Sequence, residues 1–240
     1  MISINNLSKS YNKGMVKAVD NLNLEIKRGE IFGFLGPNGA GKTTTIKMIV
    51  GLLNPDGGSI IINGFDNQKQ TIEAKRSISY VPDNPDLFDR LTGIEYLNFM
   101  ADVYQVPSQV RKERMNTFLE MFSLQDAAGD LIKSFSHGMK QKIALAGALI
   151  HDPVVWILDE PMVGLDPKSA HLVKELMRKH CERGNTVFFS THVLEVAEKL
   201  CDRIGIINKG KLVAMGTMEE LRQGDQAESL EKIFLELTEG

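Results

Sequence analysis

The sequence has few features that would tie the protein to the extracellular space, to a membrane or to nucleic acid. Its two cysteines, Cys181 and Cys201, form no C-x-x-C pair. We expect free thiols in a reducing compartment, although the count alone leaves a disulfide open. No apolar run approaches the ~20 residues that span a bilayer, and residues 1–5 lack the basic segment and apolar core of a signal peptide. The net charge of -3 provides no general attraction for polyanions. These absences predict a cytoplasmic protein that binds no nucleic acid and reaches a membrane only through a partner.

One glycine-rich stretch lies between two apolar patterns. Residues 31–35 are typical of a buried strand, and residues 44–50 have the spacing of a helix. The stretch between them follows G-x-x-x-x-G-K-[ST] and consists of Gly36, Pro37, Asn38, Gly39, Ala40, Gly41, Lys42, Thr43 and Thr44. This motif in a strand–loop–helix context predicts a phosphate-binding loop. A glycine-rich turn with a surface lysine is the alternative, but it does not explain the full spacing.

The residue types of this loop suit a nucleoside triphosphate. Glycine has no Cβ, so the backbone can wrap closely around phosphates. The N–H groups at the start of the following helix favour an anion. Lys42 can reach the β- and γ-phosphates, and the Thr43 hydroxyl can bind Mg²⁺. The loop therefore predicts that the protein binds a nucleoside triphosphate together with Mg²⁺.

Two later apolar runs end in polar side chains. Residues 154–158 are typical of a strand buried on both faces, and Asp159 and Glu160 follow them. An aspartate at this place is the usual second Mg²⁺ anchor of P-loop ATPases, and Glu160 can orient or deprotonate a water. A solvated acidic turn is the alternative. Residues 186–190 deliver His192 to the same edge, where open α/β sheets carry their active sites.

The remaining patterns predict an α/β fold, with a P-loop NTPase core and a mainly parallel sheet. Strand patterns before and after the loop, including residues 59–64 and 78–82, predict an antiparallel β subdomain. Between residues 84 and 150 the period becomes helical, which predicts an inserted α-helical subdomain with Ser136 as an N-cap. We expect the strand at 203–208 to be the last of the core. The predicted units are the core with its β subdomain at 1–83 and 151–217, the helical subdomain at 84–150, and a helical tail at 218–240.

Tyr11 is an isolated aromatic residue in the polar stretch after the first strand pattern. Its ring can cap the edge of a sheet. It can also stack on a nucleobase, a contact worth ~1–3 kcal/mol in nucleic-acid binders. The residue pattern by itself favours neither interpretation.

Five elements in one order resemble the nucleotide-binding subunit of an ABC transporter over essentially the whole chain. They are Tyr11, the phosphate loop, residues 136–141, the pair Asp159 and Glu160, and His192, and the Gly-Leu-Asp at 164–166 adds to the resemblance. The resemblance implies that Tyr11 stacks on adenine, that Glu160 is the catalytic base and that His192 contacts the γ-phosphate. It also implies that Ser136 and Gly138 bind the γ-phosphate of ATP held by a second subunit, which agrees with a serine cap at a helix start.

Two positions depart from the pattern of the family. His137 stands where the signature segment usually has glycine, although Ser136 and Gly138 are kept. Asp83 stands where the Q-loop usually has a glutamine near Mg²⁺ and the attacking water. A carboxylate can still accept a hydrogen bond from a metal-bound water, so the implied Mg²⁺ set is Thr43, Asp159 and Asp83.

The resemblance implies an ATPase that dimerises around two ATP molecules, as a homodimer or with a paralogous ATPase. The dimer would power a separate integral-membrane permease from the inner face of the cell membrane. Residues 229–238 resemble the tail of ATPases paired with export-type, ABC-2-like permeases, so we expect an exporter. The rival interpretation is a soluble ABC-type ATPase of DNA repair or translation, but those have two cassettes or a long coiled-coil insert. A small-molecule P-loop kinase does not explain residues 136–141 or His192.

Overall fold

This computed structural model describes residues 1–222 and 229–239, so residues 223–228 and 240 of the predicted tail lie outside the described residues. The larger sheet of the described chain has six strands in the order β10-β9-β3-β8-β7-β6. They are β3 (Ile31–Leu35), β6 (Ile78–Val81), β7 (Val155–Asp159), β8 (Thr186–Thr191), β9 (Arg203–Asn208) and β10 (Lys211–Gly216). All but β10 run parallel. Every residue of β3, β7 and β8 is buried, as their apolar runs predict.

The smaller sheet is antiparallel and has the order β2-β1-β4-β5. Its strands are β1 (Ile2–Tyr11), β2 (Val16–Ile26), β4 (Gly57–Ile62) and β5 (Phe65–Asp66). A short 3₁₀ turn, η1 (Asn12–Gly14), joins β1 to β2. A parallel-rich sheet with an antiparallel sheet beside it confirms the predicted fold class.

Two expectations about the strands are wrong. The pattern at 78–82 was expected in the antiparallel sheet, but β6 pairs in parallel with β7, Ile78 opposite Val155, at the edge of the larger sheet. The strand at 203–208 is not the last of the core, because β10 folds back antiparallel on β9. Lys209 and Gly210 both have positive φ, at 47° and 80°, as a two-residue hairpin turn of type I′ requires.

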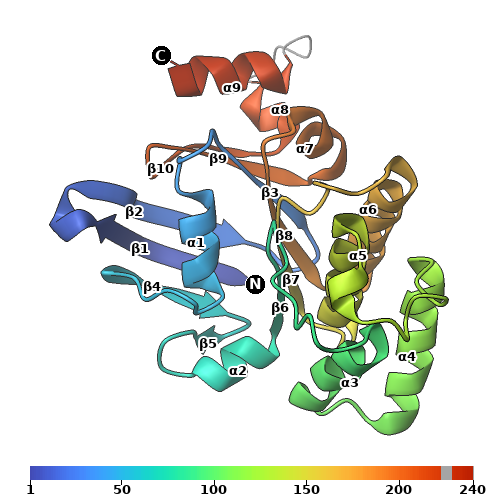
Figure 1. Ribbon diagram of the computed structural model, residues 1–240. Coiled ribbons are helices and arrows are strands. Elements are labelled where there is room, and N and C mark those ends of the chain that lie inside the picture. The colour runs from blue at the N-terminus through green and yellow to red at the C-terminus, as the bar shows by residue number, and fades with distance from the viewer. Residues whose placement is uncertain (223–228, 240) are drawn as a thin grey trace.

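Helices pack around both sheets (Figure 1). They are α1 (Lys42–Ile49), α2 (Thr71–Arg76), α3 (Gly93–Val103), α4 (Ser108–Met121), η2 (Ile132–Ser134), α5 (His137–Leu149), α6 (Pro167–Glu182), α7 (Leu194–Leu200), α8 (Met218–Leu221) and α9 (Leu230–Glu239). Capping side chains define several starts: Thr92 and Glu95 form a capping box on α3, and Asp166 caps α6. Within the described residues, no helix is both long and apolar enough to cross a bilayer.

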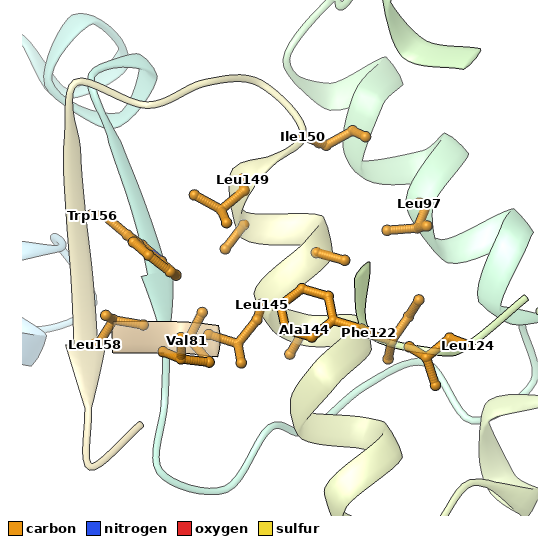
Figure 2. Packing of buried hydrophobic residues seen from close by; sticks show 14 of the residues in the cluster. Val81, Leu97, Phe122, Leu124, Ala144, Leu145, Leu149, Ile150, Trp156 and Leu158 are labelled. Atoms are coloured by element: carbon orange, nitrogen blue, oxygen red, sulfur yellow. The ribbon is translucent and has the colours of Figure 1, made fainter. Parts of the chain in front are cut away.

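The helices α3, α4 and α5 lie together, away from β1 and β2 (Figure 1). Their apolar side chains join those of the larger sheet in one cluster. Figure 2 shows Trp156 and Leu158 of β7 facing Leu145 and Leu149 of α5, with Leu97 of α3 on the far side. The helical segment therefore shares one hydrophobic core with the parallel sheet. The predicted domain boundaries stay predictions.

Candidate functional site

The glycine-rich loop has the tight backbone that its sequence predicts. It connects the carboxyl end of β3 to the start of α1. Gly41 has φ +110°, and a Cβ on it would lie 2.3 Å from the carbonyl oxygen of Ala18. A Cβ on Gly36 would lie 2.4 Å from the carbonyl oxygen of Ile207. Both distances are shorter than real Cβ contacts, so these two positions require glycine.

Lys42 lies inside this loop rather than on the surface, with 7% of its surface exposed. Its Nζ donates to the carbonyl oxygens of Gly36, at 2.6 Å, and Pro37, at 3.3 Å. Burial lowers the pKa of Lys42, while the nearby carboxylates of Glu160 and Asp159 raise it. The loop thus holds a cation at the place where a phosphate group would enter.

Asp159 is the buried carboxylate beneath the loop, only 1% exposed at the end of β7. The Thr43 hydroxyl donates to its Oδ2 at 3.0 Å, and the Ser190 hydroxyl donates to its Oδ1. Burial raises the pKa of Asp159, the two hydroxyl hydrogen bonds lower it, and the charges of Asp83 and Glu160 raise it further. The net shift is upward, so the charge on Asp159 lacks full compensation from the described protein groups.

Glu160 follows directly, with a left-handed backbone at φ 49°. Its N–H donates to both the backbone oxygen and the hydroxyl of Ser190, each at 3.2 Å. Its Oε1 lies 3.0 Å from Nδ1 of His192. Ser190 therefore fixes the backbone of Glu160, and His192 orients its carboxylate.

One cleft contains most of the predicted site residues. Its lining consists of Ala18, Pro37, Asn38, Gly39, Gly41, Lys42, Thr43, Thr44, Asp83, Asp159 and Glu160. Asp83 reaches it from the loop after β6. Within the described part of the chain, this lining does not include Tyr11, Ser136, Gly138 or His192, and His192 joins the site only through Glu160.

Gly36 and Ala40 are also outside the lining but are buried within the loop, whereas Tyr11, Ser136 and Gly138 lie at the periphery. Tyr11 is 41% exposed at the end of β1, opposite Val16 of β2. Ser136 caps α5 by accepting from the N–H of Met139 at 3.3 Å, and it is exposed, with Gly138 half-buried beside it. Ser190 and Ala18 also belong to the site, although neither was predicted from the sequence. The sequence signal for Ser190 is its place at the end of the strand pattern that leads to His192, whereas its pairing with Asp159 across neighbouring strands is visible only in the structure.

A parallel sheet whose carboxyl edge carries a glycine-rich loop, a buried lysine and a buried carboxylate is the nucleotide-binding core of a P-loop ATPase. Residues 19–163 match the family described as ABC transporter. The chain is 42% identical over 221 residues to the linearmycin resistance ATP-binding protein LnrL of Bacillus subtilis (strain 168), covering 92% of this chain and 70% of the relative. The solved structure of an ATP-binding subunit of an ABC transporter superposes with a TM-score of 0.94 at 33% identity, covering 99% of both chains. A dimeric post-hydrolysis state of the ATP-binding cassette MJ0796, bound to ADP and Pi, superposes with a TM-score of 0.82 at 28% identity, covering 91% of this chain and 99% of that one.

The chain belongs to the ABC transporter family. It is the ATP-binding and ATP-hydrolysing subunit of such a transporter, so the predictions of family, fold class and ATPase activity are confirmed. The rival interpretation, an ATPase of DNA repair or translation, is not favoured.

Proposed function

We propose that two copies of this chain, or one copy and a paralogue, close around two ATP molecules and drive a separate membrane permease, as an exporter. One observation carries the proposal. The phosphate loop lines the cleft, whereas the predicted anion-binding start of α5, at Ser136 and Gly138, lies outside it. The first N–H groups of a helix have no intrahelical partner, so an exposed helix start can accept the phosphate of a second subunit. The dimeric state of the neighbour MJ0796 supports this arrangement.

Within one cleft, the loop backbone and Lys42 hold the β- and γ-phosphates. Oxygen donors beside a phosphate loop fit Mg²⁺, which prefers hydroxyl and carboxylate ligands together with substrate phosphates. The Thr43 hydroxyl and the Asp159 carboxylate provide such oxygens 3.0 Å apart, and Asp83 shares the cleft. Mg²⁺ bound there supplies positive charge against the phosphate oxygens. The uncompensated charge of Asp159 supports this assignment.

Glu160 then acts as the base that takes a proton from the attacking water. The contact between His192 Nδ1 and Glu160 Oε1 keeps that carboxylate oriented. Through this contact the ring of His192 is held beside the base, at the sheet edge where the γ-phosphate would lie, which supports the predicted contact of His192 with that phosphate. The two Ser190 hydrogen bonds to the backbone of Glu160 hold the base in its left-handed conformation.

Tyr11 provides a direct test of how the adenine is bound. If its exposed ring stacks on the base, Tyr11→Ala should weaken ATP binding by ~1 kcal/mol or more, which is about fivefold in affinity. Tyr11→Phe keeps the stacking face and should be nearly silent. Titration of the three proteins with a fluorescent ATP analogue measures this. Equal affinities would assign Tyr11 to the edge of the sheet alone.

An exposed aromatic pair supports a permease as the partner. Phe88 and Phe99 are 55% and 42% exposed, and their rings meet edge-to-face at 5.2 Å between centroids. Ile94 and Val103 of α3 are also exposed. Phe88 belongs to the loop after β6, in which Asp83 lines the ATP cleft, so a partner bound here would contact the same loop. The relative LnrL, a resistance protein by name, supports export.

Co-expression with an export-type permease from the same genome tests the proposal directly. Co-expressed with it, the native chain should co-purify from membranes. Phe88→Ser should reduce the recovered chain about tenfold, because truncating a central aromatic at an interface typically costs more than ~1 kcal/mol. Leu52→Ser, at a side chain 65% exposed outside α3, is the matched control and should co-purify as the native chain does. Equal recovery of all three proteins contradicts a docking role for Phe88, and no recovery of the native chain contradicts the permease.

A further inference from the structure

His137, the residue that departs from the family pattern, packs directly on the loop that follows Glu160. A Cβ built on Gly164 would lie 2.3 Å from Cδ2 and 2.6 Å from Nε2 of His137. Gly164 has φ +78°, and a Cβ on Gly138 would lie 3.1 Å from the Gly164 carbonyl oxygen. Both residues are exposed, and the edge of the imidazole lies where a side chain at position 164 would begin.

Two further contacts hold the same two segments together. Lys142, on the second turn of α5, pairs with Asp166 Oδ2 at 3.0 Å. Asp166 in turn caps α6 by accepting from the N–H of Ser169 at 2.9 Å. Buried Gln141 reaches the carbonyl oxygen of Pro161 at 3.5 Å. The first two turns of α5 thus contact residues 161–166 at both ends and in the middle.

The segment from Glu160 to Leu165 forms two consecutive hydrogen-bonded turns. The N–H of Val163 donates to the carbonyl oxygen of Glu160 at 3.1 Å, and the N–H of Leu165 donates to that of Met162 at 3.3 Å. These two turns join Gly164 to the backbone of Glu160 through a few hydrogen-bonded residues. The ring of His137 is therefore connected to the carboxylate of Glu160 through packed and hydrogen-bonded groups.

We infer that His137 is a positioning residue: its ring, packed on Gly164, sets the position of Glu160 according to the position of the start of α5. The inference rests on the proposed dimer, in which that helix start binds the ATP of the partner subunit. Glu160 acts on the ATP of its own chain. The contact therefore affects the rate of hydrolysis more than the affinity for ATP.

The test is a set of full-length variants assayed for kcat and KM with MgATP. His137→Ala removes every His137 atom found near Gly164 and should lower kcat about tenfold, because misplacing a catalytic group by ~1 Å costs up to ~10²-fold. Its KM should change less than about twofold. His137→Phe keeps a flat ring on Gly164 and should retain most of the native kcat. His171→Ala, at an exposed histidine of α6, is the matched control and should behave as the native chain does.

Gly164→Ala completes a double-mutant cycle. Alanine at φ +78° is strained in either background, so it should lower kcat in both, but the loss should be several-fold smaller when His137→Ala has already removed the ring atoms nearest the Cβ. If the fold-losses in kcat of His137→Ala and Gly164→Ala simply multiply in the double variant, the inference is overturned. The inference is also overturned if His137→Phe is as slow as His137→Ala, or if His137→Ala changes only KM, since each result points to direct contact with ATP. If Gly164→Ala does not fold, the comparison of alanine with phenylalanine at position 137 still decides.

A separate measurement distinguishes failure of the inference from failure of the proposed dimer. The Glu160→Gln chain is examined for dimer formation by sedimentation with ATP. Absence of a dimer removes the proposed function on which the inference rests. A dimer together with native kcat in His137→Ala overturns the inference alone.

Discussion

Glu160→Gln is expected to slow ATP hydrolysis by ~10²-fold or more while ATP still binds, because an amide of the same size cannot accept the proton of the attacking water. The substitution leaves the rest of the site in place. The N–H of residue 160 still donates to Ser190, and an amide oxygen can still accept from His192. Steady-state ATPase assays and ATP titrations of the same preparation measure the two effects separately.

The same variant should accumulate as an ATP-bound dimer, because binding persists while hydrolysis stalls. Glu175→Gln, at an exposed carboxylate of α6, is the control and should hydrolyse ATP at the native rate without a trapped dimer. Hydrolysis at the native rate by Glu160→Gln would show that another group is the base. A variant that binds ATP and stays monomeric would contradict closure of two subunits around ATP.

The centre of the fold could be predicted because its signals are local. β3, the loop and α1 follow one another in the sequence, and the strands buried on both faces, such as β7, appear as continuous apolar runs. The glycine spacing of the loop is likewise contained in nine residues. Lys42, Asp159 and Glu160 could therefore be assigned to one cleft before any contact between them was known.

The features that were missed depend on partners far away in the chain. Ile78–Val81 is four residues long, and its place in the parallel sheet depends on Val155, which comes much later in the sequence. β10 alternates exposed and partly buried residues on an edge, so it lacks the apolar run by which β7 was recognised. The contact of His137 with Gly164 depends on how α5 packs against the loop after β7, which no pattern within either segment indicates.

The second large effect is expected at Asp159. Asp159→Asn should lower Mg²⁺-dependent ATPase activity by at least ~10²-fold, since a metal that stabilises phosphoryl charge supplies several kcal/mol of the barrier reduction. Without nucleotide, in contrast, the Asp159→Asn variant should be at least as stable as the native chain at pH 7. The hydroxyl groups that donate to the side chain of Asp159, those of Thr43 and Ser190, can rotate to suit the amide of the variant.

The reason lies in the raised pKa of Asp159, which burial causes and the charges of Asp83 and Glu160 increase. A carboxyl whose folded pKa lies above its unfolded value contributes stability below the unfolded pKa and loses it as the pH rises through the folded pKa. The native chain loses this contribution as the pH rises through the raised folded pKa, whereas Asp159→Asn has no such group to ionise. Without nucleotide, Asp159→Asn should unfold at a higher temperature than the native chain at pH 7. The difference in unfolding temperature should shrink as the pH falls toward the ordinary pKa of aspartate, ~4.

Asp126→Asn, at an exposed loop carboxylate, is the matched control and should change neither the activity nor this pH dependence. MgATP should raise the unfolding temperature of the native chain and of Asp126→Asn. MgATP should raise the unfolding temperature of Asp159→Asn much less. A ligand stabilises a protein through its binding to the folded state, and we expect this variant to bind MgATP more weakly. If Asp159→Asn unfolds at a lower temperature than the native chain at pH 7, its carboxylate is a structural anchor. If the variant gains as much from MgATP as the native chain does, Mg²⁺ is held without Asp159.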